Sequence, residues 1–317
     1  RLNFLEKLVD PKKVTPTSIE IVDIAGLVKG ANKGEGLGNK FLANIRETDA
    51  IIHVIRCFDD NEIIHVDGSI NPLRDKETIE LELQLKDLET VNKKLSKIER
   101  ASNSGDKEAQ REYNVLNKII DDLERSRNVR SIDFSTEDKM NFVKPLQLLT
   151  DKPVLYVCNV SENDVTKGNH YVKMIQKSAS KEGAEVIFLG VKIEADINEL
   201  ETYEERQLFI EDLGLNEPGS AKLITSVYKL LSLHTFFTVG KNEVRAWAIP
   251  TNSNAQEAAG VIHSDFSKGF IRAEVFAYSD YQKYKSDNKV KEAGKMRIEG
   301  KEYIVNDGDI IYFRFNV

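Results

Sequence analysis

Short apolar runs rich in β-branched residues alternate with longer amphipathic stretches over most of residues 1–232. The apolar runs lie at 18–26, 50–57, 153–160 and 184–189. Runs of this length predict buried strands, and the stretches between them, such as 168–182 and 198–212, predict helices. Continuous apolar strands that alternate with helices are typical of a parallel sheet covered on both faces. We therefore predict an α/β fold with a doubly wound, mostly parallel sheet.

A different periodicity occupies residues 76–146. Apolar side chains recur there every three or four residues, at Leu81, Leu85, Leu88, Val91, Leu95 and Ile98. The same spacing returns after a Ser-Asn-Ser-Gly-Asp turn at 102–106. Two such stripes joined by a short turn predict an antiparallel helical hairpin with a heptad-like seam. We interpret the stripe as hairpin core, and the outer face of the hairpin as a candidate partner surface.

Residues 233–317 change character and predict a β-rich domain. Short strand-like runs lie at Phe236–Val239, Val244–Ile249, Phe270–Val275, Tyr303–Val305 and Ile310–Phe315. Turn residues such as Asn306-Asp307-Gly308-Asp309 separate them. We therefore expect three parts: a split α/β domain of residues 1–75 and 147–232, a helical insertion at 76–146, and a C-terminal domain at 233–317.

Charge and apolar content narrow the class of protein. The chain has 317 residues, with 45 Lys and Arg against 52 Asp and Glu, for a formal charge of −7. This acidity argues against a general nucleic-acid coat, and we expect no DNA partner. No stretch approaches the ~20 consecutive apolar residues of a membrane span, so we expect no membrane partner either. Cys57 and Cys158 lie inside apolar runs, which favours reduced core thiols of a cytoplasmic protein.

The main candidate for chemistry is Asp23-Ile24-Ala25-Gly26, which ends the first apolar run. In P-loop nucleotidases an aspartate at this place lies near the Mg²⁺ shell, and the glycine amide faces the γ-phosphate. Glycine suits that position because a Cβ would block the approach of the backbone. The stretch that follows contains Gly34, Gly36 and Gly38, which is typical of a loop that reorders on ligand. A plain flexible surface loop is the alternative.

Leu27 follows at the position where Ras-type enzymes place a glutamine that orients the attacking water. Leucine cannot hydrogen-bond to water, so hydrolysis would need another group. His65 follows the second apolar run and is the candidate for that role. A structural histidine in a loop is at least as good an interpretation of His65, and His53, inside the run, is interpreted as a core residue.

Asn159-Val160-Ser161-Glu162 follows the third apolar run, at the strand end where doubly wound sheets bind ligands. GTPases carry Asn-Lys-x-Asp here, and the aspartate accepts two N–H bonds from guanine. Val160 replaces the lysine, and the longer Glu162 would misplace the acceptor. Guanine selectivity should therefore be weak or lost, which favours ATP as the ligand. A polar turn after a strand is the alternative.

Together these segments resemble the YchF family of Obg-like ATPases. The resemblance rests on residues 23–26, 33–48 and 159–162 and on the C-terminal stretches 268–274 and 307–317. It implies a P-loop G domain that is interrupted by a helical coiled-coil domain and followed by a β-grasp TGS domain. It also implies binding and slow hydrolysis of ATP with Mg²⁺, and the ribosome (50S or 70S) as partner.

The resemblance assigns roles to single residues. Asp23 would hold Mg²⁺ through water, and the amide of Gly26 would sense the γ-phosphate. The switch loop would contain Gly34, Gly36 and Gly38. The residues at the base would be Asn159, Val160, Glu162, Gly190 and Val191. We expect the protein to act as a monomeric, nucleotide-dependent switch.

One part of the family pattern is missing from the sequence. The phosphate loop Gly-x-x-x-x-Gly-Lys-Ser/Thr occurs nowhere in residues 1–317, and the chain begins at Arg1, without Met, inside a helical pattern. We therefore expect the remainder of a longer protein, with a sheet that is open at its first strand and with poor ATP binding and no activity as given. Two alternatives stay open: a GTPase, or a ribosome- or RNA-binding adaptor. The basic residues that would serve the adaptor are Arg245, Lys268, Arg272, Lys295 and Arg297.

Overall fold

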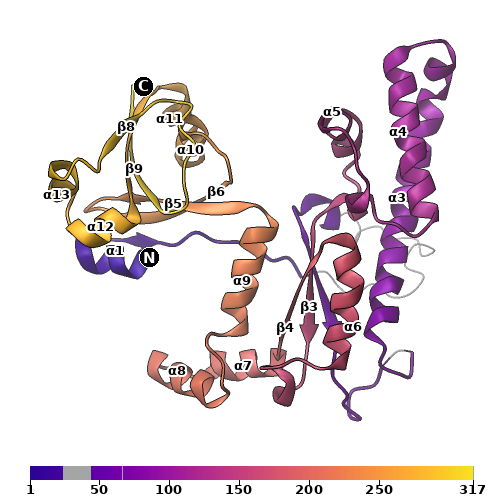
Figure 1. The fold of residues 1–317 in the computed structure, drawn as a ribbon, viewed down its shortest axis with the longest axis horizontal. Helices are drawn as coiled ribbons and strands as arrows, with labels where there is room; N and C mark the ends of the chain where they lie inside the picture. Colours follow the sequence, from indigo (N-terminus) through magenta and orange to yellow (C-terminus); the bar gives the residue numbers. More distant parts are fainter. Residues whose placement is uncertain (24–43, 66, 317) are drawn as a thin grey trace. The chain divides into compact units, whose positions relative to one another are not determined.

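The computed structural model describes residues 1–23, 44–65 and 67–316. They form two compact units: an α/β unit of Asp23–Leu230, and a β-rich unit of Arg1–Val22 together with Leu231–Val317 (Figure 1). None of the helices in the described ranges combines the length and the apolarity that a bilayer crossing needs.

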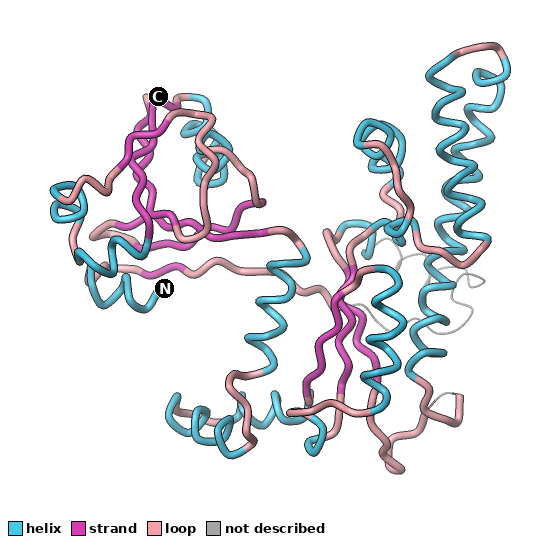
Figure 2. The backbone as a smooth tube through the Cα atoms, viewed as in Figure 1, coloured by secondary structure: helices cyan, strands magenta, loops and turns pink. Residues whose placement is uncertain are grey.

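Three parallel strands form the centre of the α/β unit (Figure 2). They are β2 (Ile51–Arg56), β3 (Val154–Asn159) and β4 (Glu185–Leu189), hydrogen-bonded in that order. Val154 to Cys158 of the central strand are all buried, as expected for a strand covered on both faces. Helix α6 (His170–Ala179) packs on this sheet through Val172 and Ile175. The predicted α/β fold with a parallel sheet is confirmed.

The strand predicted at 18–26 is not observed in its described part. Residues 16–23 have no strand structure, and the side chain of Ile21 is 60 % exposed. A β-branched run becomes a strand only where a neighbouring strand satisfies its backbone groups. Among the described strands β2 pairs with β3 alone, and Val54 of β2 is 57 % exposed. Residues 24–26 lie outside the described part of the chain.

The predicted helical hairpin is present as α3 (Pro72–Asn103) and α4 (Lys107–Glu124). Its seam is built from Val91, Val115, Leu116, Ile119 and Leu123. The stripe was predicted to begin at Leu81, but Leu81 is 49 % exposed, because α4 and the segment after it cover only the later part of α3. Asp87 fixes α3 to the entry of β3: its carboxylate accepts from the backbone N–H groups of Leu149 (2.9 Å) and Thr150 (2.8 Å).

Short helical segments complete the α/β unit. Between α4 and β3 lie η2 (Val129–Ser131), α5 (Thr136–Asp138), η3 (Lys139–Val143), η4 (Lys144–Leu146) and η5 (Leu149–Asp151). After β3 come η6 (Glu162–Asp164), η7 (Ser180–Glu182), α7 (Val191–Glu199), α8 (Tyr203–Asp212) and α9 (Gly219–Leu230). The helix predicted over 198–212 begins only at Tyr203, because Thr202 and Glu205 form a capping box there.

A six-stranded mixed sheet forms the β-rich unit, in the order β1-β6-β5-β9-β7-β8. The strands are β1 (Val14–Thr15), β5 (Leu233–Val239), β6 (Val244–Pro250), β7 (Phe270–Ala277), β8 (Arg297–Glu299) and β9 (Asp309–Phe315). Its helices are α1 (Leu2–Val9), α10 (Ala255–Ile262), α11 (Ser264–Lys268), α12 (Tyr278–Tyr284) and α13 (Asp287–Glu292). The strand predicted at Tyr303–Val305 is reduced to an isolated bridge between Ile304 and Asn254.

Residues 1–22 belong to the β-rich unit, whereas the sequence predicted residues 1–75 as part of the α/β domain. Helix α1 buries Leu5 completely in a cluster with Phe237 and Phe276, and β1 pairs in parallel with β6. The apolar face of α1 needs a complementary surface, and the C-terminal sheet supplies it.

Candidate site at the ends of the parallel strands

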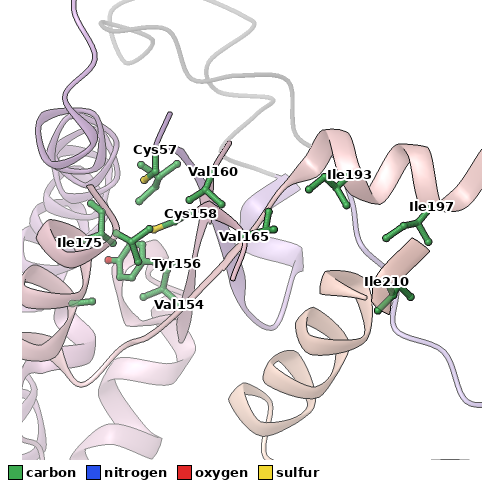
Figure 3. Close-up of a cluster of buried hydrophobic side chains, with 13 residues drawn as sticks. Cys57, Val154, Tyr156, Cys158, Val160, Val165, Ile175, Ile193, Ile197 and Ile210 are labelled. Atoms are coloured by element: carbon green, nitrogen blue, oxygen red, sulfur yellow. The ribbon is translucent and has the colours of Figure 1, made fainter. Parts of the chain in front are cut away.

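The carboxyl ends of β2, β3 and β4 are tied together by backbone hydrogen bonds. The N–H of Cys57 donates to the carbonyl of Asn159 (2.8 Å), and the N–H of Val160 donates to the carbonyl of Leu189 (3.0 Å). Beneath these bonds lies a buried cluster that includes Cys57, Cys158 and Val160 (Figure 3). Both cysteines are free thiols in this core, as predicted. The strand ends therefore rest on a rigid apolar base.

Asn159 connects the end of β3 to the start of α7. Its Oδ1 accepts from the backbone N–H of Val191 (3.0 Å), so the amide is held in one orientation. Gly190 precedes that contact, and a Cβ there would lie 2.9 Å from Cγ1 of Val165 and 3.2 Å from Cδ1 of Ile193. Only glycine fits without displacing those side chains. The structure thus brings Asn159, Gly190 and Val191 side by side.

Val160 and Glu162 take opposite environments at the same strand end. Val160 is buried, whereas Glu162 is exposed and begins η6. The side chain of Glu162 can therefore contact a ligand that binds from the solvent side. Val160 can contribute only apolar packing within the core.

Asn169 is a residue of this site that the sequence interpretation missed. Its Nδ2 donates to the carbonyl of Cys57 (2.8 Å) and to Oδ2 of Asp164 (2.9 Å), and its Oδ1 accepts from the N–H of Val172 (3.1 Å). Asn169 thus caps α6 and ties the turn after β3 to the end of β2. An asparagine directly before a helical pattern was the available signal.

The residues predicted to contact the phosphates are mostly outside the described part of the chain. Gly26, Gly34, Gly36 and Gly38 all fall there. Asp23 is described and is an exposed carboxylate in irregular backbone. Its oxygen donors are of the kind that Mg²⁺ prefers, so the residue fits the predicted ion by its chemistry.

The loop after β2 is folded around Arg56 and leads to His65. The guanidinium donates to the carbonyls of Phe58 (3.2 Å), Asp60 (3.0 Å) and Ile63 (2.9 Å). These three bonds give the loop a defined shape on the carboxyl side of the sheet.

Both ring nitrogens of His65 are engaged. Nδ1 accepts from the backbone N–H of Asp67 (3.1 Å), and Nε2 lies 3.0 Å from Oδ2 of Asp75, in the first turn of α3. Arg74 binds the other oxygen of Asp75 through Nη2 (3.0 Å) and lies 3.5 Å from Asp67. The predicted candidate is therefore a partly buried histidine held by a carboxylate.

On the other side of α3, a buried charge network joins the hairpin to the sheet. Lys76 lies 2.8 Å from Glu80 and 3.2 Å from Glu182, and Nη2 of Arg130 lies 2.9 Å and 2.8 Å from the same two carboxylates. The hydroxyl of Tyr156 lies 2.6 Å from Glu80 and 2.7 Å from Glu182. Burial favours the neutral acid, but Arg130, Tyr156 and Lys76 outweigh it and lower the pKa of Glu182. Two positive and two negative charges thus neutralise each other.

A polar cavity of about 530 Å³ opens beside this network. Its lining includes Gln84, Asn128, Ser131, Ser178 and Lys181. Because Gln84 and Asn128 bond to each other (2.7 Å) and Asn128 also bonds to Glu80, the buried part of the wall is already satisfied. Nearby, burial lowers the pKa of His53 to about 4, which keeps this ring neutral; the side chain is partly buried and its ring centroid lies 5.7 Å from that of Tyr156.

Two family models match parts of the chain. Residues 6–101 match the family model described as "50S ribosome-binding GTPase". Residues 233–316 match the family YchF-GTPase_C, described as "Protein of unknown function (DUF933)".

Similar proteins match over the whole chain. The chain is 52 % identical over 319 residues to "Ribosome-binding ATPase YchF" of Bacillus subtilis (strain 168), covering 100 % of this chain and 87 % of the relative. It is 50 % identical to the protein of that name in Escherichia coli O157:H7, covering 100 % of this chain and 86 % of the relative. The solved structure of the Schizosaccharomyces pombe YchF GTPase matches with a TM-score of 0.88 and 37 % identity, covering 99 % of this chain and 84 % of that one. The chain belongs to the YchF family.

Proposed function

We propose that the protein binds ATP at the ends of the parallel strands, hydrolyses it slowly, and acts as a nucleotide-dependent switch on the ribosome. The observation that carries the proposal is the hydrogen bond from Val191 to Asn159, which joins the end of β3 to the residue after β4. We infer that this corner binds the base. Relatives named ribosome-binding ATPases support the ribosome as partner. We propose the cytoplasm as location, because a ribosome-bound protein would act there.

The same corner supports adenine over guanine. The lysine of the GTPase pattern is replaced by Val160, which is buried. Glu162 carries one methylene more than the aspartate that accepts two N–H bonds from guanine, so its carboxylate would be displaced from that edge. The names of the relatives include both ATPase and GTPase, so they do not decide between adenine and guanine. The proposal of adenine therefore rests on these side chains.

The phosphate end is assigned to the other strand-end motif. Asp23 would hold Mg²⁺ through water, and Gly26 together with Gly34, Gly36 and Gly38 would form the loop that senses the γ-phosphate. Mg²⁺, when bound, neutralises charge on the phosphates. Positioning and charge neutralisation supply most of the catalysis in this class of reaction.

His65 is assigned the orientation of the attacking water. Support comes from its contact with Asp75, because a histidine that positions water or accepts a proton is commonly oriented by a carboxylate on its other nitrogen. If His65 serves only to stabilise the conformation of its loop, His65→Ala will lower the free energy of unfolding and leave the hydrolysis rate per bound ATP unchanged.

Competition between ATP and GTP for the protein tests the proposal. We expect ATP to bind more tightly. Val160→Lys with Glu162→Asp should raise guanine affinity by about tenfold, as one recovered charged hydrogen bond would. The matched control is Asn163→Asp, which adds an acid one residue further along η6. Tighter binding of GTP by the unmodified protein would refute the assignment of the base.

We also expect residues 1–317 by themselves to bind ATP weakly, because none of them supplies the Gly-x-x-x-x-Gly-Lys-Ser/Thr loop. Calorimetric titration of ATP into this polypeptide, and into the same polypeptide extended by such a loop, measures the difference. Equal affinities would mean that the phosphates are bound without that loop.

An adaptor that binds ribosomal RNA directly is the second candidate function. Its basic residues are largely engaged: Arg272 shares Glu274 with Arg314, and the guanidinium of Arg245 lies 3.9 Å from the centre of the Trp247 ring. Their charge is therefore partly neutralised or stacked, which weakens this alternative. A steep loss of ribosome binding between 50 mM and 200 mM salt would favour it.

A further inference from the structure

The hydrogen bonds around His65 define which of its nitrogens can receive a water. Because Nδ1 accepts the N–H of Asp67, the ring proton lies on Nε2, where it is donated to Asp75. The lone pair on Nδ1 is thus the acceptor. A water that replaces the N–H of Asp67 would donate to this nitrogen.

We propose that Asp75, in the first turn of α3, is the positioning residue that holds His65 in this tautomer for water orientation. The inference rests on the proposed role of His65 in ATP hydrolysis. When the oriented water attacks the γ-phosphorus, the bond to the β-phosphate oxygen breaks. The proton of the water passes to Nδ1 and then to solvent, while Asp75 faces the transient positive charge on the ring.

Asp75 is itself held in place. Arg74 binds its Oδ1 through Nε (3.2 Å) and Nη2 (3.0 Å), which leaves Oδ2 for His65. Arg74 is fixed in turn by the carbonyl (2.6 Å) and the hydroxyl (3.1 Å) of Ser69. The backbone N–H of Asp75 donates to the carbonyl of Asn71, the N-cap of α3. An orienting carboxylate supported this way has little freedom to turn away.

A metal ion is the competing interpretation of this cluster, since ligand atoms of His65, Asp67 and Asp75 lie within 4.8 Å of one another. Arg74 already contacts both carboxylates, at 3.0 Å and 3.5 Å. Its guanidinium supplies the positive charge that a cation would bring. The cluster therefore forms a hydrogen-bonded triad of His65, Asp75 and Arg74 without a metal ion.

The test compares variants of the protein that differ by one charge in the same turns of α3. Asp75→Asn replaces the acceptor by an amide that can donate to Nε2, which favours the wrong tautomer. We expect kcat for ATP to fall by at least about tenfold, with KM changed less than about twofold. Asp75→Glu should restore part of the rate. Glu77→Gln is the matched control, because Glu77 is exposed and its side chain is not among the partners of His65; we expect no change.

Two further measurements separate this inference from the proposed function. In a His65→Ala background, Asp75→Asn should have no further effect on kcat; an undiminished effect would overturn the inference and leave ATP hydrolysis standing. Nitrogen-15 spectra of the His65 ring report the tautomer without any nucleotide. A proton on Nδ1 in the unmodified protein would overturn the inference, and loss of the Nε2 proton in Asp75→Asn would support it. An unchanged kcat in Asp75→Asn would also overturn it.

Discussion

Removal of one charge from the buried network should destabilise the α/β unit far more than removal of an exposed charge next to it. Arg130→Met leaves Glu80 and Glu182 with Lys76 as the one remaining positive charge of the network. The side chain of Arg130 is 11 % exposed, so the surplus negative charge stays in a poorly solvated place. Breaking a buried pair in this way costs about 3–5 kcal/mol.

Arg127→Met provides the matched control on the same loop. Arg127 is 54 % exposed and contacts Asp122 at 2.9 Å. An exposed pair of this kind contributes about 0–1 kcal/mol. The ratio of the losses in unfolding free energy of the two variants therefore reflects the burial of Arg130 and not the loss of an arginine as such.

The assay can observe the two units separately. Trp247 is the single tryptophan of the chain and lies in β6, so its fluorescence follows the β-rich unit. Far-ultraviolet circular dichroism is dominated by helices, which are longest in the α/β unit. Arg130→Met should lower the midpoint of the dichroism transition by about 6–20 °C and leave the fluorescence midpoint in place. An equal, small shift for both arginine variants would refute the argument.

Three further predictions concern single positions. Gly269→Ala should destabilise the β-rich unit by about 1–3 kcal/mol in Trp247 fluorescence melts, because the new Cβ would lie 1.9 Å from the carbonyl oxygen of Asn316; Gly300→Ala, with open space around it, should be neutral. Burial keeps His53 neutral in the folded protein, with its pKa lowered from 6.5 to about 4, so only the unfolded chain takes up a proton as the pH falls below 6.5. The free energy of unfolding, measured with urea, should therefore be lower at pH 4 than at pH 7 by at most about 3 kcal/mol, and His53→Gln should remove this difference. An equal difference in that variant would assign the effect to another group. Gly190→Ala should weaken ATP binding at least about threefold in calorimetry, since the corner beside the base must shift, and unchanged affinity would place the base elsewhere.

Local periodicity was enough to predict the parallel strands, α6 and the hairpin, because each of these elements carries its own apolar pattern: β3 is a continuous buried run, and the seam of α3 and α4 repeats every three or four residues. It failed at residues 18–23, where an apolar, β-branched run has no described strand to pair with. It predicted the helix at the start of the chain but not its packing partner, because the apolar face of α1 is buried against Phe237 and Phe276, more than 200 positions away.

The candidate site was predictable in part for a similar reason. The position of Asn159 at a strand end could be predicted because the apolar run before it ends there, and strand ends in parallel sheets are common ligand sites. The partnership of His65 with Asp75 was not predictable, since it depends on where α3 begins relative to the loop after β2. The pairing of Lys76 and Arg130 with Glu182 depends on segments up to 106 positions apart and leaves no local pattern.

Helix α3 contains no glycine and no proline beyond its first residue, so it is a stiff rod over its 32 residues, about 48 Å long. The carboxylate of Asp87 accepts from the N–H groups of Leu149 and Thr150, and this attachment point divides the helix into two arms. The arm towards Asp75 is about 18 Å long and the arm towards Asn103 about 24 Å. Lys76 and Glu80 hold the arm towards Asp75 through the buried charges of Glu182 and Arg130, so a partner that displaces the hairpin tip would load these contacts before it could move the Asp75 carboxylate away from His65.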